Sequence, residues 1–286
     1  MYRSLLYVPA SSERFIAKAA ERGADAIILD LEDSVAVSEK DNARAKLAQS
    51  VERCRTGGAD VFVRINRPLR MAVRDIEAAA NSAAIGLLLS KVEGPEHAKL
   101  LLELAGECER DAGRSEPLKA MALLESPGAI FKAEAIARAD ERIIGLMGGG
   151  EDLALSLGAL PSAETLRIPK MMIHMAAMAA GRFSFGLFGT VADFADTPLI
   201  RAMAAEARRF GFTGATCVHP SVVPILNEAF SPSADEIGNA KAIIAAAEQH
   251  AAKGVGAFTV DGKMIDEPVV ERARRLLQRA AMHQTG

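Results

Sequence analysis

The sequence predicts an α/β protein built as a closed (β/α)8 barrel, with a C-terminal helical segment appended to it. Two observations predict this class. Short, almost continuously apolar runs alternate with Ala-rich stretches whose apolar residues recur every three or four positions. Eight such units occupy roughly 220 residues, which is the usual size of a (β/α)8 barrel.

Eight apolar runs are the expected strands of the barrel. In chain order they are SLLYVP (4–9), AIILDLE (26–32), VFVRIN (61–66), GLLLSKV (86–92), KAMALLES (119–126), IIGLMGG (143–149), SFGLFGT (184–190) and GATCVHPS (214–221). Strands that read as continuous apolar runs joined by helices indicate a parallel sheet that is covered on both faces. Helical stretches such as SERFIAKAAERG lie between them, and Gly23 and Gly211 are expected to end helices just before the next strand.

An open, doubly wound sheet is the alternative architecture. Nothing in the sequence marks the switch point of such a sheet, and no GxGxxG motif follows the first strand. The barrel is therefore expected to fill residues 1–231 as the catalytic domain. Residues 232–286 break the pattern and predict a long Ala-rich helix at about 234–253, a Gly-rich connector at 253–268 and a final basic helix.

Composition excludes several classes of function. The formal net charge of -3 and the pI near 6.0 do not favour a nucleic-acid partner or an acidic membrane surface. No apolar run approaches the roughly 20 residues of a membrane span, and the N-terminus passes directly into a charged helix, unlike a signal peptide. The isolated residues Cys54, Cys108 and Cys217 are expected to be reduced thiols, as in a cytoplasmic protein.

Charged and polar residues gather where the predicted strands end. In chain order they are Asp30, Glu32, Asp33, Arg64, Asn66, Lys91, Glu125, Glu151, Asp152 and His219. The carboxyl ends of barrel strands meet at one mouth, where the βα loops carry the chemistry. Unpaired charges are expensive to bury, so these side chains are expected to compensate one another or a ligand in that mouth.

Glu125 and Asp152 are the best metal candidates. Two carboxylates from neighbouring strand ends, with water and substrate oxygens in the other positions, commonly hold Mg2+. The five histidines lack the ligand spacing of a zinc site. Each acid also has a structural alternative: Asp152 as a helix cap and Glu125 as part of a turn.

Two basic residues belong to the same mouth. Arg64 offers a planar fork for a substrate carboxylate. Lys91 is either part of the site or a structural ion-pair partner of Glu32 or Asp33. His219 is expected to be a hydrogen-bonded barrel histidine and not a catalytic base.

The glycines at 148–150 directly precede the acidic pair Glu151 and Asp152. They are not a Walker phosphate loop, because no GK[ST] follows them. We expect the glycine run to clear space beside a metal-bound acid. The backbone of Gly149 and Gly150 can then approach a carboxylate or carbonyl oxygen of the substrate.

Several of these segments together resemble the citrate lyase beta subunit-like family. They are RSLLYVPASSERFIAKAAERGADAIILDLEDSVA, VRIN, GLLLSKVEG, LLESPGAI, GGGEDLALSLG, CVHPS and GAFTVDGKMIDEP, in this order over nearly the whole chain. This family is grouped with the malyl-CoA and citramalyl-CoA lyases in the wider 2-oxo-acid aldolase superfamily. The combination of DLEDSV, VRIN and the Glu125 and Asp152 pair is specific, whereas each motif alone would be weak.

The resemblance implies a commonly trimeric barrel that uses Mg2+ to cleave or form a carbon–carbon bond next to a CoA thioester. It implies that Glu125 and Asp152 are the Mg2+ ligands and that Arg64 binds the carboxylate of the 2-oxo acid. Glu32 and Asp33 would support the site or position water.

The resemblance also gives roles to the two ends of the chain. In the malyl-CoA lyase branch a segment like DGKMID closes over a neighbouring subunit's site, and its last aspartate, here Asp266, acts in acid/base catalysis. Gly254 and Gly256 suit such a lid. Coenzyme A phosphates need cations near the mouth, which Arg14 and Lys18 of the first helix can supply.

The chain departs from the family pattern in its seventh and eighth units, which read GTVADFADTPL, GAT and HPSVV. The pocket for the distal end of the substrate is therefore expected to differ. Three alternatives to a stand-alone acyl-CoA lyase remain: a CoA-independent, metal-dependent aldolase of 2-oxo acids, a lyase subunit acting on a carrier-protein thioester, and a binding barrel with a vestigial site.

Overall fold

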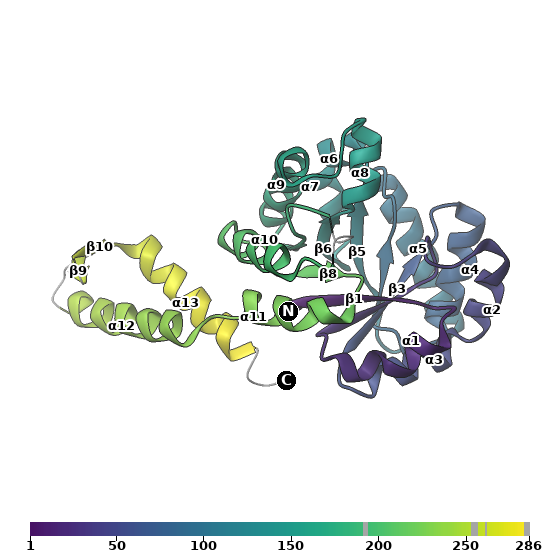
Figure 1. The fold of residues 1–286 in the computed structure, drawn as a ribbon, viewed down its shortest axis with the longest axis horizontal. Helices are drawn as coiled ribbons and strands as arrows, with labels where there is room; N and C mark the ends of the chain where they lie inside the picture. Colours follow the sequence, from purple (N-terminus) through teal and green to yellow (C-terminus); the bar gives the residue numbers. More distant parts are fainter. Residues whose placement is uncertain (191–193, 253–256, 261, 283–286) are drawn as a thin grey trace. The chain divides into compact units, whose positions relative to one another are not determined.

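The computed structural model describes residues 1–190, 194–252, 257–260 and 262–282. The chain folds into two compact units, Tyr2–Glu228 and Ala229–Gly286, the second also including Met1 (Figure 1). Each unit is described by itself below. None of the described helices is long and apolar enough to cross a membrane.

The first unit is a nearly closed barrel of eight parallel strands. The strands are β1 (Ser4–Pro9), β2 (Ala26–Asp30), β3 (Asp60–Ile65), β4 (Gly86–Leu89), β5 (Lys119–Leu124), β6 (Ile143–Gly148), β7 (Phe183–Phe185) and β8 (Ala215–Cys217). Each strand from β1 to β6 pairs with the next, and β8 pairs with β1. The predicted barrel is confirmed, and the alternative of an open, doubly wound sheet is wrong.

The ring closes between β7 and β8 through a short contact. Phe185 and Gly214 form an isolated parallel bridge, and Gly186 N donates to Gly214 O at 2.9 Å. A Cβ on Gly214 would lie 2.6 Å from the carbonyl oxygen of Arg3, so only glycine fits beside β1 here.

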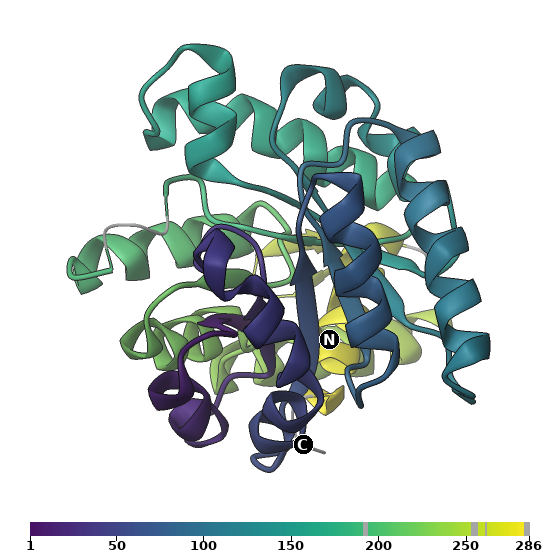
Figure 2. The same cartoon turned by 90° about the vertical axis from the view of Figure 1, so that its right-hand side faces the viewer.

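Helices surround the strands, as the two perpendicular views show (Figures 1 and 2). The α-helices are α1 (Glu13–Ala19), α2 (Lys40–Ala45), α3 (Leu47–Arg55), α4 (Leu69–Ala80), α5 (Pro95–Asp111), α6 (Pro127–Phe131), α7 (Ala133–Ala137), α8 (Gly150–Leu157), α9 (Ala163–Ala179), α10 (Thr197–Arg209) and α11 (Val223–Phe230). Short 3-10 helices are η1 (Ala20–Arg22), η2 (Val37–Glu39) and η3 (Pro220–Val222). Gly23 and Gly211 follow η1 and α10 with φ of 69° and 99°, as expected of glycines that end helices.

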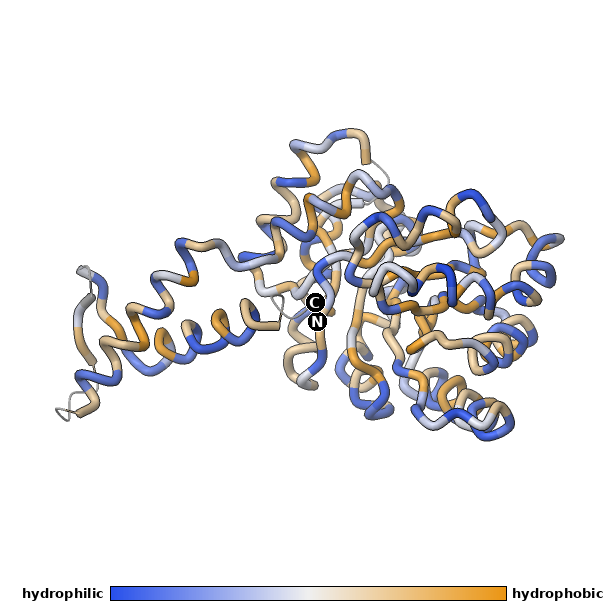
Figure 3. Tube along the Cα trace, turned by 90° about the horizontal axis from the view of Figure 1, so that it is seen from below, coloured by the Kyte–Doolittle hydropathy of each residue, from blue (hydrophilic) through white to orange (hydrophobic). Residues whose placement is uncertain are grey.

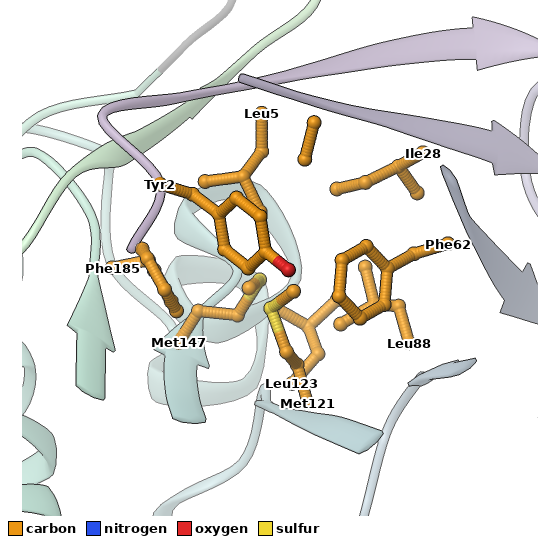
Figure 4. Close-up of a cluster of buried hydrophobic side chains, with 10 residues drawn as sticks. Tyr2, Leu5, Ile28, Phe62, Leu88, Met121, Leu123, Met147 and Phe185 are labelled. Atoms are coloured by element: carbon orange, nitrogen blue, oxygen red, sulfur yellow. The ribbon is translucent and has the colours of Figure 1, made fainter. Parts of the chain in front are cut away.

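The interior of the barrel is filled by side chains from most of its strands (Figure 4). The cluster consists of Tyr2, Leu5, Ala26, Ile28, Phe62, Leu88, Met121, Leu123, Met147 and Phe185. The Tyr2 ring meets Phe62 edge-on at 5.6 Å, and its hydroxyl donates to Asp60 Oδ2 at 2.7 Å. Tyr2 and Asp60 lie at the amino ends of β1 and β3, so their side chains fill the amino end of the barrel. The carboxyl end is therefore where a ligand can bind.

The second unit contains two long helices and a hairpin: α12 (Ala234–Ala251), β9 (Phe258–Val260), β10 (Lys263–Ile265) and α13 (Glu267–Met282). Ser233 and Glu236 form a capping box that starts α12. The two helices are present where the sequence predicts them, whereas the antiparallel hairpin lies inside the segment expected to be a connector. Hydrophobic and hydrophilic residues alternate along the helices of both units, as amphipathic helices require (Figure 3).

Candidate active site

The carboxyl ends of β2 and β3 are joined by an ion pair between Asp30 and Arg64. Arg64 donates to Asp30 from Nε and Nη2, both at 2.7 Å, and its Nη1 lies 2.8 Å from Glu32 Oε2. Burial acts against ionisation of Asp30, but the hydrogen bonds from Arg64 hold the pKa of Asp30 below its ordinary value. These contacts use three of the five guanidinium N–H groups, and two are left for another acceptor.

Lys91, which follows β4, contacts acids that follow three other strands. Its ammonium lies 2.8 Å from Glu32 Oε1, 3.5 Å from Asp33 Oδ2 and 3.5 Å from Asp152 Oδ2. Its backbone N–H donates to Glu125 Oε2 at 3.0 Å. Lys91 has φ of 48°, a left-handed conformation that costs a non-glycine residue energy and is concentrated at functional sites.

Glu125 and Asp152 are brought together beside this network. Glu125 follows β5 and is 7% exposed, and Asp152 lies in the first turn of α8, after β6. The pKa of Glu125 is raised to about 8, chiefly because the carboxyl is buried. The hydrogen bond with Asp152 and the negative charges of Asp152 and Glu32 raise it further. A cation bound between these two carboxylates would offset their mutual repulsion and stabilise the charged form of Glu125.

The glycine before α8 makes room for the Glu125 carboxylate. A Cβ on Gly149 would lie 2.8 Å from Glu125 Cγ and 3.0 Å from Glu125 Cδ, closer than ordinary contacts allow. Gly149, and not Asp152, occupies the N-cap position of α8, so the capping alternative for Asp152 is wrong. Gly150 begins the helix, and its N–H is one of the donors that a helix N-terminus leaves without a helical partner.

Most of these residues, but not Glu32 or Lys91, line a cavity of about 430 Å³ at the barrel mouth. Its lining contains five carboxylates (Asp30, Asp33, Glu125, Glu151, Asp152) and two cations (Arg64, Lys170), so negative charge is in excess. Within the described residues no group of three or more His, Cys, Asp or Glu side chains could hold a metal ion. The pair of carboxylates fits Mg2+, which commonly binds one or two protein carboxylates and keeps water or substrate oxygens as its other ligands.

The raised pKa of Glu125 predicts that the metal-free protein loses stability as the pH rises from 4.5 to about 8. The folded state keeps the Glu125 proton to a higher pH than the unfolded chain, so it binds more protons in this window and a rise in pH favours unfolding. The loss is expected to be on the order of a few kcal/mol. Urea unfolding in EDTA across this window checks it, and a Glu125→Gln variant with the same decline would contradict it.

The other expected site residues are not among those that line this cavity. The exposed residues Arg14 and Lys18 line a second cavity of about 360 Å³ that shares Tyr7 and Pro9 with the first. Asp266 belongs to the second unit and caps α13, where its backbone carbonyl accepts from Val270 N at 3.1 Å. Gly254 and Gly256 lie outside the described residues.

The remaining predictions concern residues around the mouth. His219 accepts or donates a hydrogen bond with Ser221 at 2.7 Å, and its ring stacks on Phe194, as expected of a structural histidine. The predicted alternative for Lys91, an ion pair with Glu32 or Asp33, is present.

Lys170 of α9 is a further residue of this cavity, and it was not expected from the sequence. The Lys170 amine is buried and donates to Leu187 O at 2.7 Å and to Gly189 O at 2.8 Å. Leu166, Ile173 and Ala177 of the same helix are also buried, so the helical spacing places this lysine on the apolar face. A lysine on the apolar stripe of a helix is the signal that could have singled it out.

The barrel, its filled amino end and the acidic cavity at its carboxyl mouth are the features of a (β/α)8-barrel enzyme. A family model, HpcH/HpaI aldolase/citrate lyase, matches residues 3–220. The chain belongs to this family, which confirms the resemblance inferred from the sequence motifs.

Similar proteins agree with this assignment. The chain is 32% identical to citrate lyase subunit beta of Escherichia coli K12, over 98% of this chain and 93% of that protein. It is 31% identical to the mitochondrial citramalyl-CoA lyase of Homo sapiens, over 95% and 83%. A structure of the protein CitE from Mycobacterium tuberculosis, in complex with magnesium, acetoacetate and coenzyme A, superposes with a TM-score of 0.78 at 33% identity and covers 97% of both chains. The chain is therefore an enzyme of the lyase class.

Proposed function

We propose that the chain is a Mg2+-dependent carbon–carbon lyase acting on a 3-hydroxy-carboxyacyl-CoA thioester. Cleavage would give a 2-oxo acid and an acyl-CoA by way of the acyl-CoA enolate, and the reverse reaction would form the same bond. The observation that carries the proposal is the convergence of Glu125 and Asp152 in the acidic cavity. The magnesium and coenzyme A in the CitE complex support the same chemistry here.

Glu125 and Asp152 would hold the metal. Bound Mg2+ would supply a Lewis acid that polarises the carbonyl formed from the substrate hydroxyl. Lys91 keeps Glu125 in place through its backbone N–H, and Gly149 leaves the space that this carboxylate needs.

The chain's own groups would orient the substrate. The two N–H groups of Arg64 that its ion pairs leave available, and the backbone N–H groups of Gly149 and Gly150, would bind the carboxylate of the 2-oxo acid portion. Glu32 and Asp33 would support this arrangement through Arg64 and Lys91 and position water.

The acyl-CoA portion would extend from the mouth into the second cavity. Arg14 and Lys18 would bind the phosphates of coenzyme A there, since both line that cavity and neither has an ion-pair partner among the described residues. Because the two cavities share Tyr7 and Pro9, one extended thioester could reach both.

Asp266 would complete the reaction from a neighbouring subunit. When the carbon–carbon bond breaks, the hydroxyl proton is taken up by a base, and the acyl-CoA enolate needs a proton at carbon, which Asp266 would donate. We infer a homotrimer in the cytoplasm, in which residues 232–286 act as a lid on the adjacent barrel.

The proposal is tested by offering the purified protein malyl-CoA, both citramalyl-CoA stereoisomers and citryl-CoA with Mg2+. The released 2-oxo acid is trapped as a hydrazone. We expect thioester cleavage that stops when EDTA is added.

Two other outcomes would replace the proposal. Cleavage of a thioester only when it is attached to an acyl-carrier protein would identify a complex subunit, an alternative favoured by the subunit name of the Escherichia coli relative. Cleavage of free hydroxy acids without any thioester would identify a CoA-independent aldolase.

An Asp266→Asn variant is expected to lower kcat about 10²- to 10⁴-fold, the usual contribution of a general acid, and to leave metal binding unchanged. Asparagine caps helices as well as aspartate does, so α13 should be preserved. Mixing this variant with Asp152→Asn subunits should restore part of the activity, because a mixed trimer can contain sites with both native carboxylates. Equal inactivity of the mixture and of its two components would contradict a site shared between subunits.

A further inference from the structure

The two cavities at the barrel mouth meet at three residues. Tyr7, Pro9 and Val218 line both the reaction cavity and the second cavity, which Arg14 and Lys18 also line. The side chains of Pro9 and Val218 are apolar, so the phenol hydroxyl of Tyr7 is the only side-chain hydrogen-bond donor of these three. A thioester that extends from one cavity into the other passes this hydroxyl.

The Tyr7 ring points from β1 toward the interior of the barrel, at its carboxyl end. Side chains alternate between the two faces of a strand, so Leu5 and Tyr7 share one face. Leu5 belongs to the interior cluster, and Tyr7 packs against that cluster two residues nearer the mouth (Figure 4). The ring also lies against the guanidinium of Arg64, whose Cζ is 5.0 Å from the ring centroid. These contacts hold the ring and leave its hydroxyl for a ligand.

The hydroxyl of Tyr7 stays protonated in this position. Burial raises the pKa of Tyr7 well above its ordinary value, although the charge of Arg64 opposes the rise. The nearby acids Asp30, Glu125 and Glu32 raise it further. Within the described residues the hydroxyl forms no hydrogen bond. It is therefore a neutral donor whose acceptor has to come from a ligand or from water.

Carbon–carbon cleavage creates a need for such a donor. When a base takes the hydroxyl proton of the substrate, the electron pair of the breaking bond moves into the acyl-CoA portion, and the thioester carbonyl oxygen becomes the enolate oxygen. Arg64 and the backbone of Gly149 and Gly150 are assigned to the carboxylate of the 2-oxo acid portion. The enolate oxygen has no donor in that assignment, and a fixed donor at an oxygen that gains charge lowers the barrier.

We propose that the Tyr7 hydroxyl donates a hydrogen bond to the thioester carbonyl oxygen and stabilises the acyl-CoA enolate that cleavage produces. This inference rests on the proposed function and adds a catalytic residue to it. Tyr7 keeps its own proton throughout, and the proton that the enolate carbon needs still comes from Asp266. The hydrogen bond strengthens as charge builds on the oxygen, so its effect falls on kcat and not on substrate binding.

A Tyr7→Phe variant tests the inference, because it keeps the ring and its contact with Arg64 and removes only the hydroxyl. The kcat of thioester cleavage should fall about 10²- to 10³-fold, the usual effect of removing one such donor. KM for the same thioester, and the Mg2+ affinity measured by calorimetry, should stay within about threefold of wild type. A purely structural role would change these two quantities along with kcat.

Infrared difference spectra give a signature of the hydrogen bond itself. The probe is acetyl-CoA labelled with carbon-13 at the thioester carbonyl, bound to the full chain with Mg2+. A hydrogen bond polarises a carbonyl and lowers its stretching frequency. The labelled band should therefore lie at a lower frequency in wild type than in Tyr7→Phe.

Tyr2→Phe is the matched control. Tyr2 is the other tyrosine of the chain, and its ring also lies inside the barrel. Its hydroxyl donates to Asp60 Oδ2 at the amino end, far along the barrel from the mouth. Tyr2→Phe should lower the melting temperature, leave kcat within about twofold of wild type and leave the acetyl-CoA carbonyl band in place.

The outcomes separate this inference from the proposed function. If Tyr7→Phe cleaves the thioester with the kcat of wild type, or if the two carbonyl bands coincide, Tyr7 does not bind the enolate oxygen and the lyase proposal stands. If the Mg2+ affinity falls together with kcat, the hydroxyl acts on the metal site and the inference is wrong. If wild type cleaves no thioester, the proposed function fails and this inference fails with it.

Discussion

A Glu125→Gln variant is expected to lose at least about three orders of magnitude in kcat/KM for thioester cleavage. The change removes one of the two carboxylates proposed to hold the metal, and a metal's Lewis acidity contributes several kcal/mol to such a reaction. The fold should survive, because glutamine occupies nearly the same volume and avoids the repulsion that raises the pKa of Glu125 to about 8. Steady-state release of the 2-oxo acid measures the loss.

Thermal unfolding separates this effect from simple destabilisation. In EDTA at neutral pH the Glu125→Gln variant should have a melting temperature equal to or above that of wild type, because a buried, partly charged carboxyl is replaced by a neutral amide. Glu134→Gln is the control, since Glu134 lies on the exposed side of α7, where it pairs with Arg138, and it should keep full activity. Activity in Glu125→Gln within tenfold of wild type would exclude Glu125 from the metal site.

A Gly149→Ala variant is expected to lower kcat/KM about a hundredfold. Its new methyl group would lie 2.8 Å from Glu125 Cγ, so the Glu125 side chain must shift from its position. Displacements of about 1 Å at a reacting centre cost rates of this order. The affinity for Mg2+, followed by calorimetry, should fall with the activity.

Gly128→Ala provides the matched comparison for Gly149→Ala. A Cβ on Gly128, in α6, would meet nothing within 4 Å, so the same substitution should leave activity unchanged. If Gly149→Ala kept both wild-type activity and wild-type Mg2+ affinity, the close approach of Gly149 to Glu125 would have no part in the site.

Most of the barrel could be predicted from the sequence because its strands are buried on both faces. The runs around Ile28, Leu88 and Met121 are apolar without interruption. Such runs indicate a parallel sheet, but they do not distinguish an open sheet from a closed barrel. Closure of the barrel depends on the contact of Phe185 with Gly214, next to strands of three residues each. No local sequence pattern predicts such a contact. The hairpin of β9 and β10 was missed because its strands are also only three residues long.

The site was predictable where a charged residue directly follows an apolar strand. Glu125, Asp152 and Arg64 are found this way because the carboxyl ends of the strands converge. The role of Lys91 depends on a left-handed backbone conformation, and the role of Lys170 depends on carbonyl groups some twenty residues along the chain. Both are properties of the folded chain and not of local residue patterns.

The location of the metal tests the account most directly. Crystals of the wild type grown with Mn2+ in place of Mg2+, with data collected at the manganese edge, would give an anomalous difference peak at the ion. The account predicts one peak in each barrel, within about 2.3 Å of a carboxylate oxygen of both Glu125 and Asp152, and no such peak in Asp152→Asn crystals. A fully occupied peak elsewhere, or an unchanged peak in the variant, would contradict it.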